Sequence, residues 1–155
     1  MELLRRAYDG DAWYGASVRA ALDGVDARMA TTRHLPGAHT ICEIVLHLTA
    51  WTREVTRRLR TGVARDPEEG DWPAGGVAND AEWAAIVAAL DAANAALLEA
   101  IGELDEGQLH QRIGDVRDRA LGSGVSRYVT LHGLIQHDAY HGGQISLLKR
   151  AAHGS

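Results

Sequence analysis

The chain of 155 residues contains no phenylalanine, one cysteine and three prolines. With a single cysteine, Cys42, no disulfide can form within the chain. Without phenylalanine, the core must be built from leucine, alanine, valine and four tryptophans. Hydrophobic residues make up 46% and charged residues 24%, which is ordinary for a globular protein of this length. We therefore expect a single domain over residues 1–155.

The sequence also lacks an excess of positive charge and a long apolar run. Its net charge is -5, whereas nucleic-acid binding needs clustered lysine and arginine. We interpret its short basic cluster as a solvated helix face: Arg53, Arg57, Arg58 and Arg60. No run approaches the roughly 20 apolar residues that span a bilayer, and residues 1–11 carry charge where a signal peptide needs apolar residues. We expect a cytoplasmic protein that binds neither nucleic acid nor membrane.

Four segments show the apolar periodicity of helices. They extend from about Leu3 to Val25, from Thr40 past Leu59, from Asn79 or Asp80 to Leu104, and from about Thr130 to Ala151. The letters "TICE" fit a capping box, with Thr40 as N-cap and Glu43 three residues later. No segment is a convincing strand. The pattern predicts an all-α four-helix bundle.

The connections refine this prediction. About twenty residues rich in glycine, proline and acid, "TGVARDPEEGDWPAGGVAND", separate the second and third helices. This connection is long enough to cross the bundle, so the two helices could run parallel, with a long crossover between them. Residues 105–127 are ambiguous, and "LGSG" at 121–124 predicts a flexible turn. It is not a phosphate loop, because no strand precedes it and no Lys-Ser/Thr follows.

Two histidines lie on the apolar stripe of the fourth helix. At 100° per residue, His137 and His141 share a narrow arc with Leu134 and Ile145. They are one turn apart, the spacing at which two imidazoles can reach one ion. His47 flanks the apolar stripe of the second helix, so three imidazoles could converge. The alternative is a set of hydrogen-bonded core histidines, although unpartnered buried imidazoles are costly.

The other five histidines are not expected in this cluster. His132 lies nine residues before His141 and so points to the opposite side of the helix. The remaining four lie in loops or near the end of the chain and are predicted to be surface residues: His34, His39, His110 and His153. A di-iron site is excluded because the chain has no Glu-x-x-His, and a zinc-protease site because it has no HExxH.

Two stretches resemble one protein family. "HTICEIVLHLTAW" at 39–51 and "LHGLIQHDAYHGGQISLLK" at 131–149 resemble the DinB-like (YfiT-like) superfamily of damage-inducible-type four-helix bundles. "YDGDAWYGASVRAAL" near the start and "DWP" at 71–73 are also similar, so the resemblance spans nearly the whole chain. It implies that His47, His137 and His141 bind a divalent ion such as nickel, zinc or iron. It also implies a long crossover between the second and third helices.

The resemblance also suggests an activity. The family includes S-transferases that use a low-molecular-weight thiol such as bacillithiol or mycothiol. Three protein nitrogens leave a coordination position open for water or a small-molecule substrate, as in catalytic zinc sites. Such an ion could equally serve a hydrolase. The alternatives are a non-catalytic stress-response protein that binds metal or a small ligand, and a bundle whose core histidines bind nothing. No general base is evident, so enzymatic activity stays open.

Several neighbours of the histidines are pocket candidates. Gln144 and Trp51 lie beside the histidine stripes, and Gln144 could orient a ligand or substrate. Asp138 either accepts from an imidazole N–H or is exposed. Asn94 interrupts the third helix and either contacts the pocket or fixes the register of the bundle. Cys42 lies in a first helical turn, where the dipole can lower a thiol pKa. It points away from the apolar stripe, so no catalytic role is expected.

Glycines in the fourth helix suggest a close contact. Each costs roughly 1 kcal/mol relative to alanine. Gly143 lies about 200° from His141 and shares the reverse face with Gly133, Tyr140 and Leu147. Small residues there would let another helix approach, either within the chain or in a second subunit of a homodimer.

Overall fold

The computed structural model describes residues 2–117 and 124–153 and is mostly helical, which confirms the all-α class. "LGSG" falls largely outside the described residues. The elements follow the chain as α1 Glu2–Asp9, α2 Val18–Leu22, α3 Ala27–Thr31, α4 Ile41–Thr61, β1 Val63–Ala64, α5 Asp80–Gly102, α6 Glu106–His110, β2 Gly114–Asp115 and α7 Arg127–His153. The two-residue strands pair in parallel and were not predicted.

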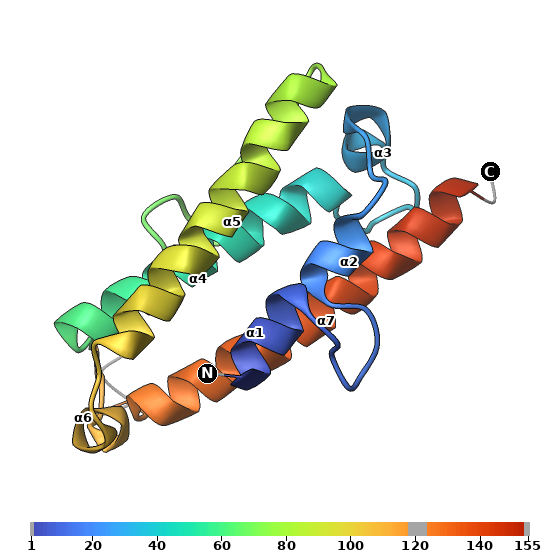
Figure 1. The fold of residues 1–155 in the computed structure, drawn as a ribbon. Helices are drawn as coiled ribbons and strands as arrows, with labels where there is room; N and C mark the ends of the chain where they lie inside the picture. Colours follow the sequence, from blue (N-terminus) through green and yellow to red (C-terminus); the bar gives the residue numbers. More distant parts are fainter. Residues whose placement is uncertain (1, 118–123, 154–155) are drawn as a thin grey trace.

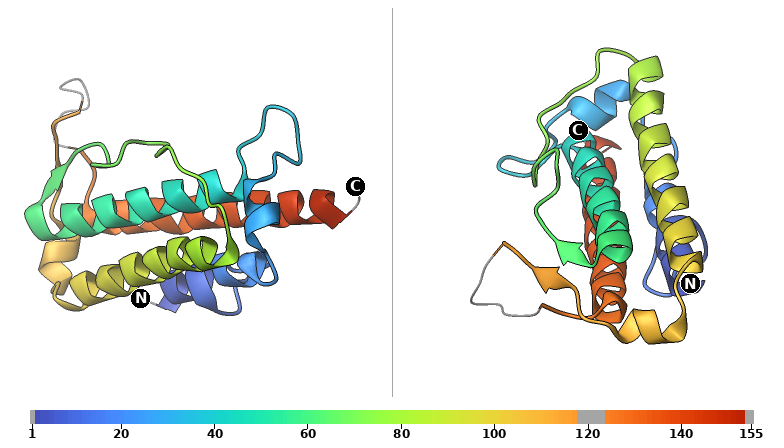
Figure 2. Two further views of the ribbon diagram at one scale, coloured as in Figure 1. Left: turned by 90° about the horizontal axis from the view of Figure 1, so that it is seen from above. Right: turned by 90° about the vertical axis from the view of Figure 1, so that its left-hand side faces the viewer.

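The three long helices form the frame of the molecule (Figure 1). Helix α4 packs against both α5 and α7. Helices α4 and α7 are antiparallel, since Arg127 at the start of α7 donates to the carbonyl of Leu59 near the end of α4. Figure 2 shows residues 65–79 returning along α4, so that α4 and α5 run in the same direction.

Capping residues fix the ends of the long helices. Thr40 accepts from the backbone N–H of Glu43, and the Glu43 carboxylate accepts from that of Thr40, which confirms the predicted capping box. Gly62 ends α4 with a φ of 69°, a left-handed conformation that glycine adopts without strain. Asn79 caps α5 through the N–H of Glu82.

The single helix predicted for residues 3–25 was wrong, because the chain breaks there between α1 and α2. Gly10 lies just beyond the end of α1, and Gly15 has a φ of 139°. Ser17 then starts α2 as its N-cap, accepting from the N–H of Ala20. The break corresponds to the two glycines, which weaken a helix because their backbone is freer when unfolded. The third short helix, α3, was also missed; Asp26 caps it.

The apolar core has two clusters, one toward each end of α4 and α7. One cluster takes Ile44 and Leu48 from α4 and Ile145 from α7. The other takes Leu59 from α4 and Leu131 from α7. Each includes residues of α1 and α5. On α7, His137 and His141 lie between the residues of the two clusters, whereas on α4 His47 lies next to Leu48 of the first cluster.

Helix α5 corrects the expectation that no segment is apolar enough to span a bilayer. Within residues 2–117 and 124–153, it is the one helix that meets the length and composition of a membrane span. Its many alanines raise its apolarity without giving it bulky side chains. Helix α5 packs on α4, with Trp83, Leu90 and Leu97 buried in the clusters above. A mostly buried core helix meets the same criteria, but only 28% of this stretch of α5 is buried.

The glycines of α7 face two environments. Gly142 is buried, and a Cβ there would make ordinary van der Waals contact with the backbone oxygen of Ala16, at 3.7 Å. Gly133 and Gly143 are exposed, and a Cβ at either would meet no described atom within 4 Å. Packing within the chain therefore requires a glycine at neither Gly142 nor Gly143. A homodimer through the exposed face stays a prediction.

Candidate metal centre

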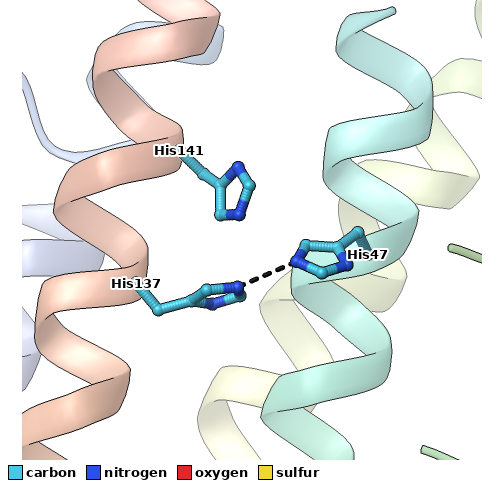
Figure 3. A group of neighbouring side chains, drawn as sticks. All are labelled: His47, His137 and His141. Carbon is cyan, nitrogen blue, oxygen red and sulfur yellow. Dashed lines mark hydrogen bonds between the residues drawn. The ribbon is translucent and has the colours of Figure 1, made fainter. Parts of the chain in front are cut away.

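Helices α4 and α7 bring three imidazoles together (Figure 3). His47 projects from α4, and His137 and His141 project from successive turns of α7. One ring nitrogen from each lies within 4.8 Å of the other two. The Nε2 atoms of His47 and His137 are 2.8 Å apart, the contact drawn as a dashed line. The structure thus unites the three residues that the sequence selected.

Hydrogen bonds fix two of the three rings. The Nδ1 atom of His47 donates to the backbone carbonyl of Asp71 at 2.5 Å, and a carbonyl can only accept. The Nδ1 atom of His141 donates to Oε1 of Gln144 at 2.7 Å. A neutral imidazole with its proton on Nδ1 leaves the Nε2 lone pair free. In both rings Nε2 is therefore the atom available to bind a metal ion. Gln144, predicted to orient a ligand or substrate, instead orients His141.

The third ring tests whether the cluster suits a cation. His137 Nδ1 is buried with no hydrogen-bond partner in the described chain, and its Nε2 faces His47. Its single proton therefore sits either between two Nε2 atoms or on an unpartnered nitrogen. With that proton on Nδ1, all three Nε2 lone pairs are available. Three nitrogens of this kind are a donor set that nickel, zinc or iron accepts.

Burial keeps these imidazoles neutral. Desolvation lowers the pKa of His137 to about 4, and the neighbouring His141 and His47 act in the same direction. Desolvation also lowers the pKa of His47 and that of His141. The hydrogen bonds of these rings to Asp71 and Gln144 raise the two pKa values, but by less than burial lowers them. Neutral imidazole is the form that binds metal. The cluster is thus in its ligating form near neutral pH.

The connection between α4 and α5 covers the cluster, a feature that the sequence reasoning missed. The indole of Trp72 stacks on His47, with centroids 4.0 Å apart, and on His39 on its other side at 3.6 Å. The carboxylate of Asp71 accepts from Trp51 Nε1 at 2.7 Å. The one available signal was the "DWP" stretch, noted for its resemblance alone. His39 is exposed as predicted, but it is part of this stack.

A cavity of about 450 Å³ opens beside His47 and His137. It lies between α4 and α7, and Trp51 forms part of its wall. Two other charged groups line it, Asp71 and Arg58. The arrangement combines a set of convergent nitrogens with space for a small molecule next to two of them.

The remaining candidates lie elsewhere or in other environments. Asp138 is buried, which raises its pKa to about 7, and its charge acts on Tyr8 and Tyr14 rather than on the imidazoles. It has no hydrogen bond to the three histidines among the described residues. Asn94 is half-buried on α5 and does not line the cavity.

Two expectations about single side chains were wrong. Cys42 lies in the core rather than away from it, and burial raises the pKa of its thiol rather than lowering it. Arg58 is not part of a solvated face, because it is 7% exposed and paired with the buried Glu54. In both cases α4 is covered on more sides than one apolar stripe suggests.

The other histidines lie apart from the cluster. The ring of His132 contacts Tyr128, as does that of His110. His34 is half-buried and bonds to the carbonyl of Met29. The side chain of His153 lies outside the described residues.

Fold and site together define a helical protein with a three-histidine centre suited to a divalent metal ion. A family model described as the DinB superfamily matches residues 13–145. The chain belongs to the DinB superfamily, as its motifs indicated. No curated protein and no solved structure shows significant similarity to it. Family membership and the histidine cluster both fit a metal-binding protein.

Proposed function

We propose that this protein is a metal-dependent enzyme that transfers a low-molecular-weight thiol, of the bacillithiol or mycothiol type, to a small electrophilic substrate. The observation that carries the proposal is the convergence of three imidazole nitrogens beside a cavity lined by two of the same histidines. Three neutral protein ligands leave a coordination position and the full charge of the ion available. A closed structural site would instead be filled by four protein ligands.

The ion would be nickel, zinc or iron, held by His47, His137 and His141. When bound, it would lower the pKa of a thiol and so supply a thiolate nucleophile at neutral pH. Asp71 and Gln144 would keep the rings in the ligating tautomer. Trp72 would cover His47 and limit the access of water.

The proposed reaction needs no oxidant. The thiol sulfur forms a bond to an electrophilic carbon of the substrate, and the leaving group departs with the electron pair of the broken bond. The thiol proton passes to solvent. The walls of the cavity would hold the substrate and displace water, which strengthens charge interactions at the reacting atoms.

Further features belong to the same proposal. We interpret the fold as a four-helix bundle with a crossover between α4 and α5, in which α1 and α2 together take the place of the first helix. The protein would act in the cytoplasm, as a homodimer, on a small molecule. A hydrolase would use the same centre with water in place of the thiol. A non-catalytic stress-response protein would bind metal or ligand without turnover.

Cobalt substitution tests the open position. Cobalt(II) in the centre should develop a sulfur-to-metal charge-transfer band when a small thiol such as cysteamine is added. The effect should weaken as pH falls and the thiol and histidines protonate. A spectrum indifferent to thiols, azide and pH would overturn the transferase. Turnover of a thiol with an alkyl halide, measured with and without metal, then separates an enzyme from a binding protein.

A further inference from the structure

The cavity beside the histidines follows one face of α4. Its lining residues on that helix are His47, Trp51, Val55 and Arg58, spaced four, four and three residues apart. This spacing places them on one side of a helix. At about 1.5 Å per residue, the backbones of His47 and Arg58 are about 16 Å apart along the helix axis, so the cavity is elongated along α4. The guanidinium of Arg58 reaches back over Trp51, 5.3 Å from the centroid of its ring, and that ring is 6.4 Å from those of His47 and His137. The guanidinium and the imidazoles are therefore no more than about 12 Å apart.

The antiparallel α7 forms the facing wall. From the histidine end it contributes His137, then Leu134 and Gly133, then Thr130 and Val129. Between its two ends the lining is mainly apolar, from Trp51 and Val55 on one wall and from leucine and valine on the other. Such a groove favours a ligand whose middle part is apolar.

Arg58 is held rigidly at its end of the groove. Its Nε donates to Glu54 Oε1 at 2.8 Å, and its Nη2 donates to the carbonyl of Arg65 at 2.6 Å. Its guanidinium lies over the ring of Trp51, 5.3 Å from the centroid. No acceptor for Nη1 is found in the part of the chain that the structure describes. The two N–H groups of Nη1 on this fixed, largely buried cation thus remain available.

Arg58 belongs to a network of arginines and carboxylates. Glu54, 3% exposed, accepts from both Arg57 and Arg58 and from the backbone N–H of Arg65. One carboxylate therefore faces two guanidiniums. The nearby Asp115 pairs with Arg117 and also acts on Arg58, while Asp66 acts on Arg117. Carboxylates therefore hold Arg58 in place, and the N–H groups that they leave free on this buried guanidinium favour a further acceptor, of which a carboxylate makes the strongest bond.

We propose that the groove binds an elongated small molecule with an apolar middle and a terminal carboxylate, which Arg58 holds at the end remote from the histidines. The reacting group of the molecule would then lie at His47 and His137. Arg58 is a specificity-determining residue in this assignment. The part that concerns the reacting end rests on the proposed function; the part that concerns Arg58 does not.

The first test measures binding without reaction. Straight-chain carboxylates of increasing length are titrated into the full-length protein, with the alcohol of equal length as control, and followed by calorimetry. We expect the carboxylates to bind at least about tenfold more tightly, the scale of one charge-assisted hydrogen bond. We also expect affinity to rise with chain length up to an optimum. Equal affinities for acids and alcohols in the unaltered protein would overturn the proposal.

Variants locate the effect. Arg58→Gln should remove the preference for acids over alcohols, whereas Arg60→Gln, at an exposed arginine of the same helix, should keep it. Arg58→Lys keeps the charge and should keep part of the preference, which guards against a variant that merely unfolds. A folded Arg58→Gln protein, judged by circular dichroism, that retains the full preference would contradict the proposal.

A second test links the two ends. Mercaptocarboxylates and mercaptoalcohols of matched length are added to the cobalt-loaded protein, and the charge-transfer band gives their affinity. The acids should bind more tightly at the optimal length, and Arg58→Gln should equalise the two series without changing the affinity for cobalt. If no thiol produces a band but carboxylates still bind through Arg58, the transferase fails and the groove stands. If thiols produce the band with no preference for acids, the open metal position stands and the role of Arg58 fails.

Discussion

Two regions of the molecule gather histidines on α7, and they differ in what surrounds the rings. In the metal centre, His137 and His141 face His47 across the gap between α7 and α4. In the second region, His132 contacts Tyr128, which also contacts His110. Both regions combine residues distant in sequence. Ring nitrogens point at one another only in the metal centre, and only there do hydrogen bonds donated to Asp71 and Gln144 set the tautomers.

The difference shows that a histidine joins the metal centre because of its position around α7, and not merely because it is a histidine on that helix. His132 is nine residues from His141, which is half a turn of the circle around α7. That offset removes it from the stripe between α4 and α7. Burial then lowers the pKa of each imidazole of the centre and so favours the form that binds a metal.

The largest expected effect separates the two regions by mutation. His47→Ala, His137→Ala and His141→Ala should each weaken nickel or zinc binding more than about 100-fold, beyond the cost of losing a supporting hydrogen bond. His132→Ala should leave the affinity unchanged. Calorimetric titration of metal-free protein measures all four. If His132→Ala behaves like the other three, the assignment of the centre is wrong.

Acid should destabilise the metal-free protein through the buried His137. The pKa of folded His137 is lowered to about 4, against about 6.5 in an unfolded chain. Between these values the unfolded chain binds a proton that folded His137 does not, so metal-free protein should lose stability as pH falls from 6.5 toward 4. Urea unfolding at several pH values measures the loss. His137→Gln should flatten this dependence, and a His137→Gln protein that keeps the full loss of stability would contradict the explanation.

The hydrogen bonds that hold the imidazole rings should have the next largest effect on metal affinity. Gln144→Leu removes the acceptor for His141 Nδ1 and should weaken metal binding about tenfold. Gln136→Leu is the matched control, since Gln136 is exposed on the same helix. A titration in which both variants bind like the unaltered protein would show that the bond to Gln144 does not support the centre.

The covering tryptophan should have a smaller effect. Trp72→Leu removes the ring stacked on His47, at a cost of about 0.5–1.5 kcal/mol, or roughly threefold to tenfold in metal affinity. Trp13 is fully exposed, and Trp13→Leu should change nothing. Quenching of tryptophan fluorescence by nickel should fall sharply in the first variant only. Equal quenching in both would contradict the position of Trp72.

The smallest effect on metal binding is expected at Gly143, which faces away from the centre. Gly143→Leu should leave metal affinity unchanged, because its Cβ enters open space in a single chain. In sedimentation it should shift a dimer toward monomer if the exposed face of α7 joins two subunits. Loss of metal affinity in a folded variant would contradict this placement.

Periodicity and capping were sufficient for the helices that hold the site. The limits of α4 and α5 follow from Thr40, Glu43 and Asn79, and the stripe of α7 placed His137 and His141 correctly. Glycines at 10 and 15 were noted as weak points, but propensity alone did not show that the helix would break there. A single apolar stripe also could not reveal that α4 is covered on several sides.

The parts of the site that were missed come from outside the regular elements. Asp71 and Trp72 lie in a connection with no periodicity, so nothing local shows that they cover His47. Arg58 is paired with Glu54, four residues before it. Pairs with this spacing are also common on exposed helix surfaces, so the sequence alone does not show that Arg58 is buried. Its burial depends on Arg65 and on α7, both placed by tertiary structure.

The central claim is that His47, His137 and His141 hold one divalent ion. Elemental analysis of protein purified without chelator and without a histidine tag tests it directly, alongside a His47→Ala/His137→Ala double variant. The account predicts about one nickel, zinc or iron ion per chain in the unaltered protein and almost none in the double variant. A metal-free protein that takes up no ion on titration, or equal metal content in both proteins, would contradict it.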